Sequence, residues 1–133
     1  MTATAQPTTQ LLGSIGQLAL SVPDVAAAVR FYRDVLGLPF LFEAPPSLAF
    51  FDCGGVRLML SAPEAGQAHA PSTGAIYFRV PDIQAAHAAL TARGVAFEEG
   101  PKLIARMPDH ELWMAFLRDP GGNVLALMAE VRP

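Results

Sequence analysis

The chain has 133 residues, of which 52% are hydrophobic and 16% are charged, and its formal net charge is −3. This composition predicts one globular domain with a substantial core and excludes a disordered class. The acidic balance argues against nucleic-acid binding, and no apolar run is long enough for a membrane span. The single cysteine, Cys53, permits no intrachain disulfide, which favours a reducing cytoplasmic compartment.

The sequence repeats itself after a loose N-terminal tail, which we expect over residues 1–12. Val22-Pro23-Asp24 returns as Val80-Pro81-Asp82, 58 residues later (81 − 23 = 58), and each copy leads into an alanine-rich stretch that ends at a glycine. A second similarity links residues 49–60 with residues 115–127. Two copies of one unit predict a pseudo-twofold arrangement with the site between the copies.

The first unit is expected over residues 13–61. Asp24 is a good N-cap for a helix over residues 25–36, and Gly37 can take the left-handed conformation that ends it. Gly54-Gly55 predicts a hairpin turn. The strands of this unit are expected over residues 15–22, 39–42, 48–52 and 56–61.

The second unit is expected over residues 75–130, after a flexible linker over residues 62–74 that is rich in Pro, Gly and Ala. An apolar run begins at Ile76, Asp82 starts the helix and Gly94 ends it. The later strands are expected over residues 95–98, 112–118 and 124–129, with a turn at residues 120–123.

Each unit is therefore interpreted as βαβββ, and the fold class as α+β. The tandem modules are expected to form a cup-shaped mixed sheet with the helices on its outer face. One helix for four strands covers one face only, so the other face is left concave for the second unit, a second chain or a ligand. The high mean hydropathy, +0.34, favours a homodimer that buries apolar surface.

These features resemble the vicinal oxygen chelate superfamily, which includes glyoxalase I, extradiol dioxygenases, methylmalonyl-CoA epimerase and the bleomycin- and fosfomycin-resistance proteins. The resemblance covers about residues 13–130, and its most specific parts are residues 31–38 (FYRDVLGL) and residues 119–123 (DPGGN). Both parts are structural, a capped helix and a turn, so they indicate the fold more strongly than the chemistry.

The family's metal sites use His, Gln or Glu on the first and last strand of each unit. The resemblance carries these positions to Gln17, Met59, Ala75 and Ala126. Gln17 offers one neutral oxygen, Met59 offers a soft thioether that suits hard divalent ions poorly, and the two alanines offer nothing. The resemblance therefore implies a member that uses no metal or other cofactor and binds a ligand in the same cavity.

The cavity wall is predicted from strand alternation and the family's inward-facing positions. An aromatic and thioether wall with one amide and one carboxylate suits a flat, partly apolar small molecule, including one that carries a positive charge. Met114 and Phe116 would then pack under the helices. The alternative is that the aromatic residues are ordinary core. The predicted wall consists of Gln17, Phe50, Met59, Tyr77, Glu111 and Trp113.

Glu111 is the strongest candidate for chemistry, because a carboxylate beside Trp113 on an apolar face can have a raised pKa and act as a general base. The alternative is a carboxylate in water or paired with Arg79, Arg106 or Arg118. His110 is a candidate hydrogen-bond donor, but adjacent residues on a strand point to opposite faces, so His110 and Glu111 do not easily share a metal ion.

Three other residues are interpreted without a catalytic role. Cys53 has no evident histidine partner and is expected to be a small buried hydrophobe. His69 lies in the linker, and His87 is expected at the surface of the second helix.

Three hypotheses of function follow. The first is a protein that binds and sequesters a small aromatic or hydrophobic molecule in a metal-free pocket, as bleomycin-resistance proteins do. The second is an isomerase, epimerase or lyase that uses Glu111 as its base, with Gln17 or His110 as donor. The third is a metal-dependent lyase or dioxygenase. Whether the protein is an enzyme is left open by the sequence.

Overall fold

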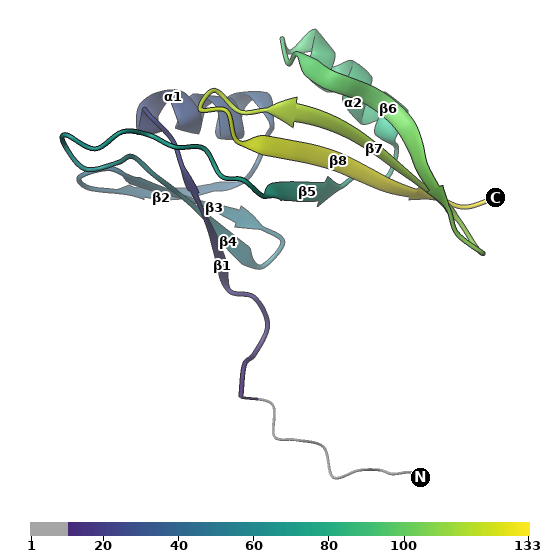
Figure 1. The fold of residues 1–133 in the computed structure, drawn as a ribbon, viewed down its shortest axis with the longest axis horizontal. Coiled ribbons are helices and arrows are strands. Elements are labelled where there is room, and N and C mark those ends of the chain that lie inside the picture. Colours follow the sequence, from purple (N-terminus) through teal and green to yellow (C-terminus); the bar gives the residue numbers. More distant parts are fainter. Residues whose placement is uncertain (1–10) are drawn as a thin grey trace.

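The computed structural model describes residues 11–133, so the N-terminal tail predicted over residues 1–12 lies outside the described residues except for Leu11 and Leu12. The strands form two four-stranded sheets with the orders β1-β4-β3-β2 and β5-β8-β7-β6. In each sheet the first pair is parallel and the other pairs are antiparallel. The shared order confirms the α+β fold built from two βαβββ modules (Figure 1).

The strands of the first sheet are β1 (Gln17–Ser21), β2 (Phe40–Ala44), β3 (Leu48–Cys53) and β4 (Val56–Ser61). Those of the second sheet are β5 (Ala75–Arg79), β6 (Phe97–Arg106), β7 (Glu111–Arg118) and β8 (Val124–Val131). We call the unit that contains the first sheet module 1 and the unit that contains the second sheet module 2.

The helices begin where the sequence predicts. α1 (Val25–Val29) continues into the π-helical segment η1 (Arg30–Val35), and α2 (Ile83–Ala92) is the helix of module 2. The carboxylates of Asp24 and Asp82 accept hydrogen bonds from Ala27 N and Ala85 N, at 3.3 and 3.1 Å, and so cap the two helices. None of the helices in residues 11–133 is both long and apolar enough to cross a lipid bilayer.

β6 differs from the prediction. A strand over residues 95–98 was expected, but the strand covers Phe97–Arg106. Its pairing with β7 is interrupted by register shifts, and Gly100 and Pro101 lie within it. Glycine and proline normally signal the end of a strand, so local sequence predicted an early end, whereas the long partner β7 keeps the strand paired beyond them.

The two modules share one core, and Tyr32 lies at its centre. The Tyr32 ring is fully buried, with its centroid 5.5 Å from that of Phe31 and 5.8 Å from that of Phe51. The same cluster includes Leu117 and Leu125 of module 2. Because α1 and α2 cover the same side of the molecule in Figure 1, the opposite faces of the sheets carry no helix.

A buried polar cluster of Tyr32, Asp119 and Asn123 joins the modules, and we call it the intermodule polar cluster. Tyr32 Oη donates to Asp119 Oδ2 at 2.7 Å. Asn123 Nδ2 donates to the same carboxylate oxygen at 2.9 Å and to the carbonyl of Ser21 in β1 at 2.8 Å. Buried polar groups are stable only when they are hydrogen-bonded, so this cluster fixes the modules against each other at one place.

The linker is also attached to both modules, although the sequence predicted it to be flexible. The ring of His69 lies 3.0 Å from Ser21 Oγ through Nδ1 and 2.7 Å from the carbonyl oxygen of Gly121 through Nε2. Ser72 N donates to Asn123 Oδ1 at 2.7 Å. These contacts, which local composition cannot predict, hold the middle of the linker between module 1 and the β7–β8 turn.

Candidate functional site

The predicted wall residues of module 1 lie on one face of the first sheet. Gln17 Nε2 lies 3.8 Å from Met59 Sδ, and Met59 is the cross-strand partner of Phe50. The Phe50 ring is covered by its own neighbours, because Phe42 stacks on it at 4.7 Å between centroids and the Arg57 guanidinium lies 5.5 Å from its centroid. Gln17 and Met59 are therefore more open to a ligand than Phe50.

In module 2 the prediction of which face of the sheet each β7 side chain lies on is wrong. Tyr77 pairs with Ala126, Ala126 pairs with Phe116, and the rings of Tyr77 and Phe116 are 6.2 Å apart, so these residues share a face. Side chains alternate along a strand, which puts Trp113 on the opposite face, where it packs against the core. Met114 and Phe116, expected under the helices, lie instead on the face of Tyr77.

Glu111 shares the face of Trp113 and not that of Tyr77. Its Oε1 accepts a hydrogen bond from Trp113 Nε1 at 3.2 Å, and its Oε2 lies 3.5 Å from Arg106 Nε. The structure thus places the Glu111 carboxylate next to Trp113 and Arg106 and does not bring it to Gln17 or Tyr77. A carboxylate with these partners is not aimed at the open faces of the sheets, although its predicted role as a base stays untested.

His110 lies beside Glu111, at the turn between β6 and β7. Its Nδ1 is 2.7 Å from Asp109 Oδ1 and its Nε2 is 4.0 Å from Glu130 Oε2. The hydrogen bond with His110 lowers the pKa of the Asp109 carboxyl. His110 therefore belongs to a charged cluster at the end of the second sheet, away from Gln17 and Tyr77, and its role as a donor stays a prediction.

The positions that correspond to the family's metal ligands do not form a site for a divalent ion. Gln17 and Met59 contact each other in module 1, whereas Ala75 and Ala126 stand on β5 and β8. An amide and a thioether give one hard donor atom. Across residues 11–133, no group of three or more His, Cys, Asp or Glu side chains is arranged to hold a metal ion.

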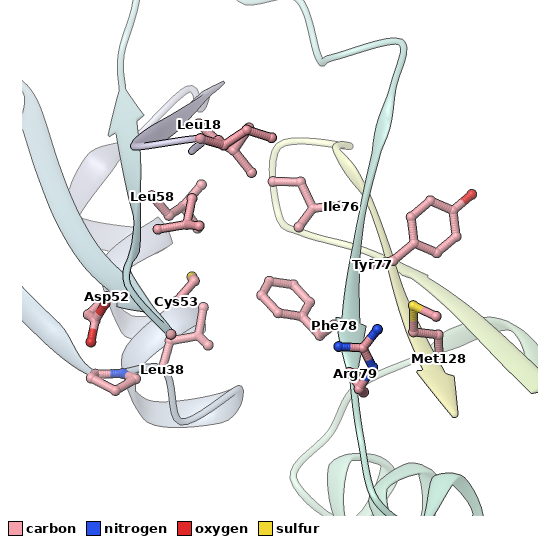
Figure 2. Close-up of a pocket in the computed structure, with 14 residues that line it drawn as sticks. Leu18, Leu38, Asp52, Cys53, Leu58, Ile76, Tyr77, Phe78, Arg79 and Met128 are labelled. Carbon is pink, nitrogen blue, oxygen red and sulfur yellow. The ribbon is translucent and has the colours of Figure 1, made fainter. Parts of the chain in front are cut away.

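A cleft of about 780 Å³ lies between the modules (Figure 2). Leu18, Leu38, Leu58 and Cys53 form its module 1 side, and Ile76 and Phe78 of β5 point toward them. The cleft continues around β5, where it is lined by Tyr77, Arg79 and Met128, on the other side of the strand. Within residues 11–133, β5 pairs only with β8, and β1 pairs only with β4. Both strands that border the cleft therefore have a free edge.

Two polar side chains on the module 1 side have limited chemical reactivity. Burial, with a smaller contribution from Asp52, raises the pKa of the half-buried Cys53 thiol. The Asp52 carboxylate accepts a hydrogen bond from Gly55 N at 2.9 Å in the turn between β3 and β4. The Cys53 thiol is thus a weaker nucleophile at neutral pH than a free thiol.

Tyr77 is the one residue of this cleft that the sequence predicted to bind a ligand. Leu18, Leu58, Ile76 and Phe78 were not predicted, because hydrophobic alternation assigns such residues to the core. A signal was present in β5, where apolar residues occur at both parities (AIYFR), as expected for a strand with both faces in apolar surroundings.

Comparison with known proteins agrees with the fold. The sequence profile of the Glyoxalase/Bleomycin resistance protein/Dioxygenase superfamily matches residues 14–127. The metallothiol transferase FosB of Staphylococcus haemolyticus is 37% identical over 51 residues, which are 38% of this chain and 36% of FosB, so the chain matches about a third of that relative's length. The uncharacterised protein YraH of Bacillus subtilis is 29% identical over 126 residues, 84% of this chain and 94% of YraH.

Solved structures of other proteins have the same fold as this chain. The lactoylglutathione lyase of Agrobacterium tumefaciens superposes with a TM-score of 0.71 at 27% identity, over 90% of this chain and 96% of that chain. A glyoxalase/bleomycin resistance protein/dioxygenase from Nocardioides gives a TM-score of 0.71 at 24% identity, over 94% of this chain and 90% of that chain. With its paired βαβββ modules and the profile match along most of its length, the chain belongs to the Glyoxalase/Bleomycin resistance protein/Dioxygenase superfamily.

Proposed function

We propose that this protein binds a small apolar or aromatic molecule in the intermodule cleft without using a metal ion. The observation that carries the proposal is the cleft itself, whose volume of about 780 Å³ lies in the range of small-molecule sites. Apolar side chains from both modules line most of it. Burial of an apolar ligand against them supplies the binding free energy.

The side chains at the positions of the family's metal ligands support binding without a metal ion. FosB and the lactoylglutathione lyase are named for enzymatic activities, and FosB is named as a metallothiol transferase. In this chain an amide, a thioether and two methyl groups occupy the corresponding positions. We therefore propose binding and sequestration rather than metal-assisted catalysis. The described contacts of Glu111 do not favour the alternative in which it acts as a base.

The test uses N-phenyl-1-naphthylamine, a neutral fluorophore that brightens in apolar sites. We expect saturable binding of one fluorophore per chain, unaffected by a chelator. Leu18 lines the cleft and is 39% exposed, and Leu18→Gln should weaken binding about tenfold, or ~1.4 kcal/mol, because a polar group replaces an apolar contact.

Leu41→Gln is the matched control, since Leu41 is also a half-exposed strand leucine, 47% exposed, but lies in β2 outside the cleft. Its affinity should equal that of the wild type. Absence of saturable binding, or equal losses in the two variants, would overturn the proposal.

We also propose that the chain forms a homodimer. The mean hydropathy of the chain is high, at +0.34, and half-exposed apolar side chains lie outside the cleft, among them Phe42, Ile104 and Val131. A second copy of the chain can bury such surface. Light scattering should give twice the 14.1 kDa chain mass, with and without the fluorophore. A monomer mass at all concentrations would contradict the proposal.

A further inference from the structure

Arg79, the last residue of β5, is a cationic group of the cleft without a partner. Its guanidinium makes no hydrogen bond, ion pair or aromatic contact with any other residue in 11–133. Most other basic side chains have such a contact, for example Arg33 with Asp34 and Arg118 with Glu98. The contrast singles out Arg79, because an unpaired arginine beside an apolar cleft is available to a ligand.

The acidic residue of the cleft does not neutralise Arg79. Asp52 also lines the cleft, but it belongs to the module 1 wall, whereas Arg79 belongs to the module 2 wall (Figure 2). Asp52 is hydrogen-bonded to Gly55 N within its own turn. The cleft therefore has apolar walls, a carboxylate held in a turn on one side and an available guanidinium on the other.

The side chains along β5 connect the apolar part of the cleft to the Arg79 guanidinium. Ile76 and Phe78 point toward Leu18 and Leu58, while Tyr77 and Arg79 lie on the other side of the same strand, and all of them line one continuous cleft. A molecule whose apolar body lies against Phe78 and extends around the free edge of β5 reaches the guanidinium. Arginine binds a carboxylate through two parallel hydrogen bonds, which gives both affinity and orientation.

We propose that the ligand of the cleft is an apolar carboxylate, with Arg79 binding its anionic group. The inference rests on the proposed function and narrows it from apolar molecules in general to apolar monoanions. An uncharged ligand of the same shape fills the cleft but leaves the guanidinium without a partner.

The experiment compares two molecules of nearly equal shape, 1-naphthoate, which is ionised at neutral pH, and 1-naphthamide, which is neutral. Each competes with bound N-phenyl-1-naphthylamine, and the concentration that displaces half of the fluorophore is measured. In the wild-type protein 1-naphthoate should displace it at about tenfold lower concentration, and added salt should reduce this preference. In Arg79→Gln the two concentrations should become equal.

Arg30→Gln is the control, because Arg30 is exposed and lies on η1, outside the cleft. This variant should keep the full preference for 1-naphthoate. Equal competition by the two molecules in the wild type, or a preference that survives in Arg79→Gln, would overturn the inference while leaving the proposed function intact. Failure of the fluorophore to bind the wild-type protein at all would overturn both.

Discussion

At the scale of single residues, Tyr32 has the most demanding environment. It is fully buried, and its hydroxyl donates to the buried carboxylate of Asp119 across the two modules. Burial, reinforced by the neighbouring Asp119, raises the pKa of Tyr32 above its usual value of 10.0. The folded protein therefore requires the neutral phenol at this position.

Tyr32→Phe should lower the free energy of unfolding at neutral pH by about 1–3 kcal/mol, because Asp119 loses a donor in a buried site. The pH dependence has a definite sign. The pKa of Tyr32 is raised on folding, so its contribution to stability is complete below pH 10.0 and is lost as the pH rises above that value. The alkaline loss of stability should therefore be smaller in Tyr32→Phe.

Urea unfolding at neutral and alkaline pH measures both effects. Tyr77→Phe is the control, since Tyr77 is 47% exposed and its hydroxyl has no carboxylate partner in the described chain. It should change neither the neutral stability nor the alkaline slope. A Tyr32→Phe variant as stable as the wild type would show that the hydrogen bond to Asp119 contributes nothing to the folded state.

The positions of individual side chains were only partly predictable. Gln17 and Met59 share a face as expected, because buried and less buried residues alternate along β4 and the register with β1 pairs Gln17 with Arg57. In β7 both parities are apolar, with Leu112, Met114 and Phe116 on one side and Trp113 and Leu117 on the other. Hydrophobicity cannot decide between two such faces, and the register with β8 and the position of α2 settle it.

At the scale of elements, the β7–β8 turn depends on a glycine without a side chain. A Cβ on Gly121 would lie 2.7 Å from Pro23 Cδ and 3.2 Å from His69 Nε2. Pro23 belongs to module 1 and its ring cannot rotate away, so the turn can approach β1 only because residue 121 is glycine. The same turn provides Asp119 and Asn123 to the intermodule polar cluster.

Gly121→Ala should therefore destabilise the protein by about 1–3 kcal/mol through overpacking at the junction of the modules. The unfolding free energy in urea measures this change. Gly74→Ala is the matched control, since the nearest atom to its added Cβ would be Ser72 Oγ at 3.9 Å, an ordinary contact. Equal stability of the two variants would contradict the close approach of the turn to Pro23.

The helix starts and glycine turns were predictable because their signals are local. Asp24 and Asp82 cap their helices, and Gly37 and Gly94 have positive φ angles of 78° and 94°. The length of β6 was not predictable, because it depends on pairing with β7 despite Gly100 and Pro101. The fixed position of His69 in the linker was not predictable either, because it depends on contacts with Ser21 and Gly121, which are distant in the sequence.

At the scale of the whole molecule, the repeat predicted both βαβββ modules but not the order of strands within each sheet or how the modules meet. The cleft exists because β1 and β5 keep free edges while the polar cluster holds the modules together at another place. The free edges belong to each module by itself, whereas the polar contacts depend on both modules together. The predicted wall assumed that the concave faces form the pocket, whereas the cleft also uses the helix-facing residues Ile76 and Phe78.

The central claim is that a small apolar molecule occupies this cleft without a metal ion, and Cys53 reports on it directly. Cys53 is the only cysteine of the chain and lines the cleft, so alkylation by iodoacetamide can be followed by mass spectrometry as a single event per chain. The rate is measured in chelator-treated protein with and without saturating 1-naphthoate. We predict alkylation about tenfold slower with 1-naphthoate, and no such protection in urea-unfolded protein. An unchanged rate in the folded protein, or protection that appears only when a divalent ion is added, would contradict the claim.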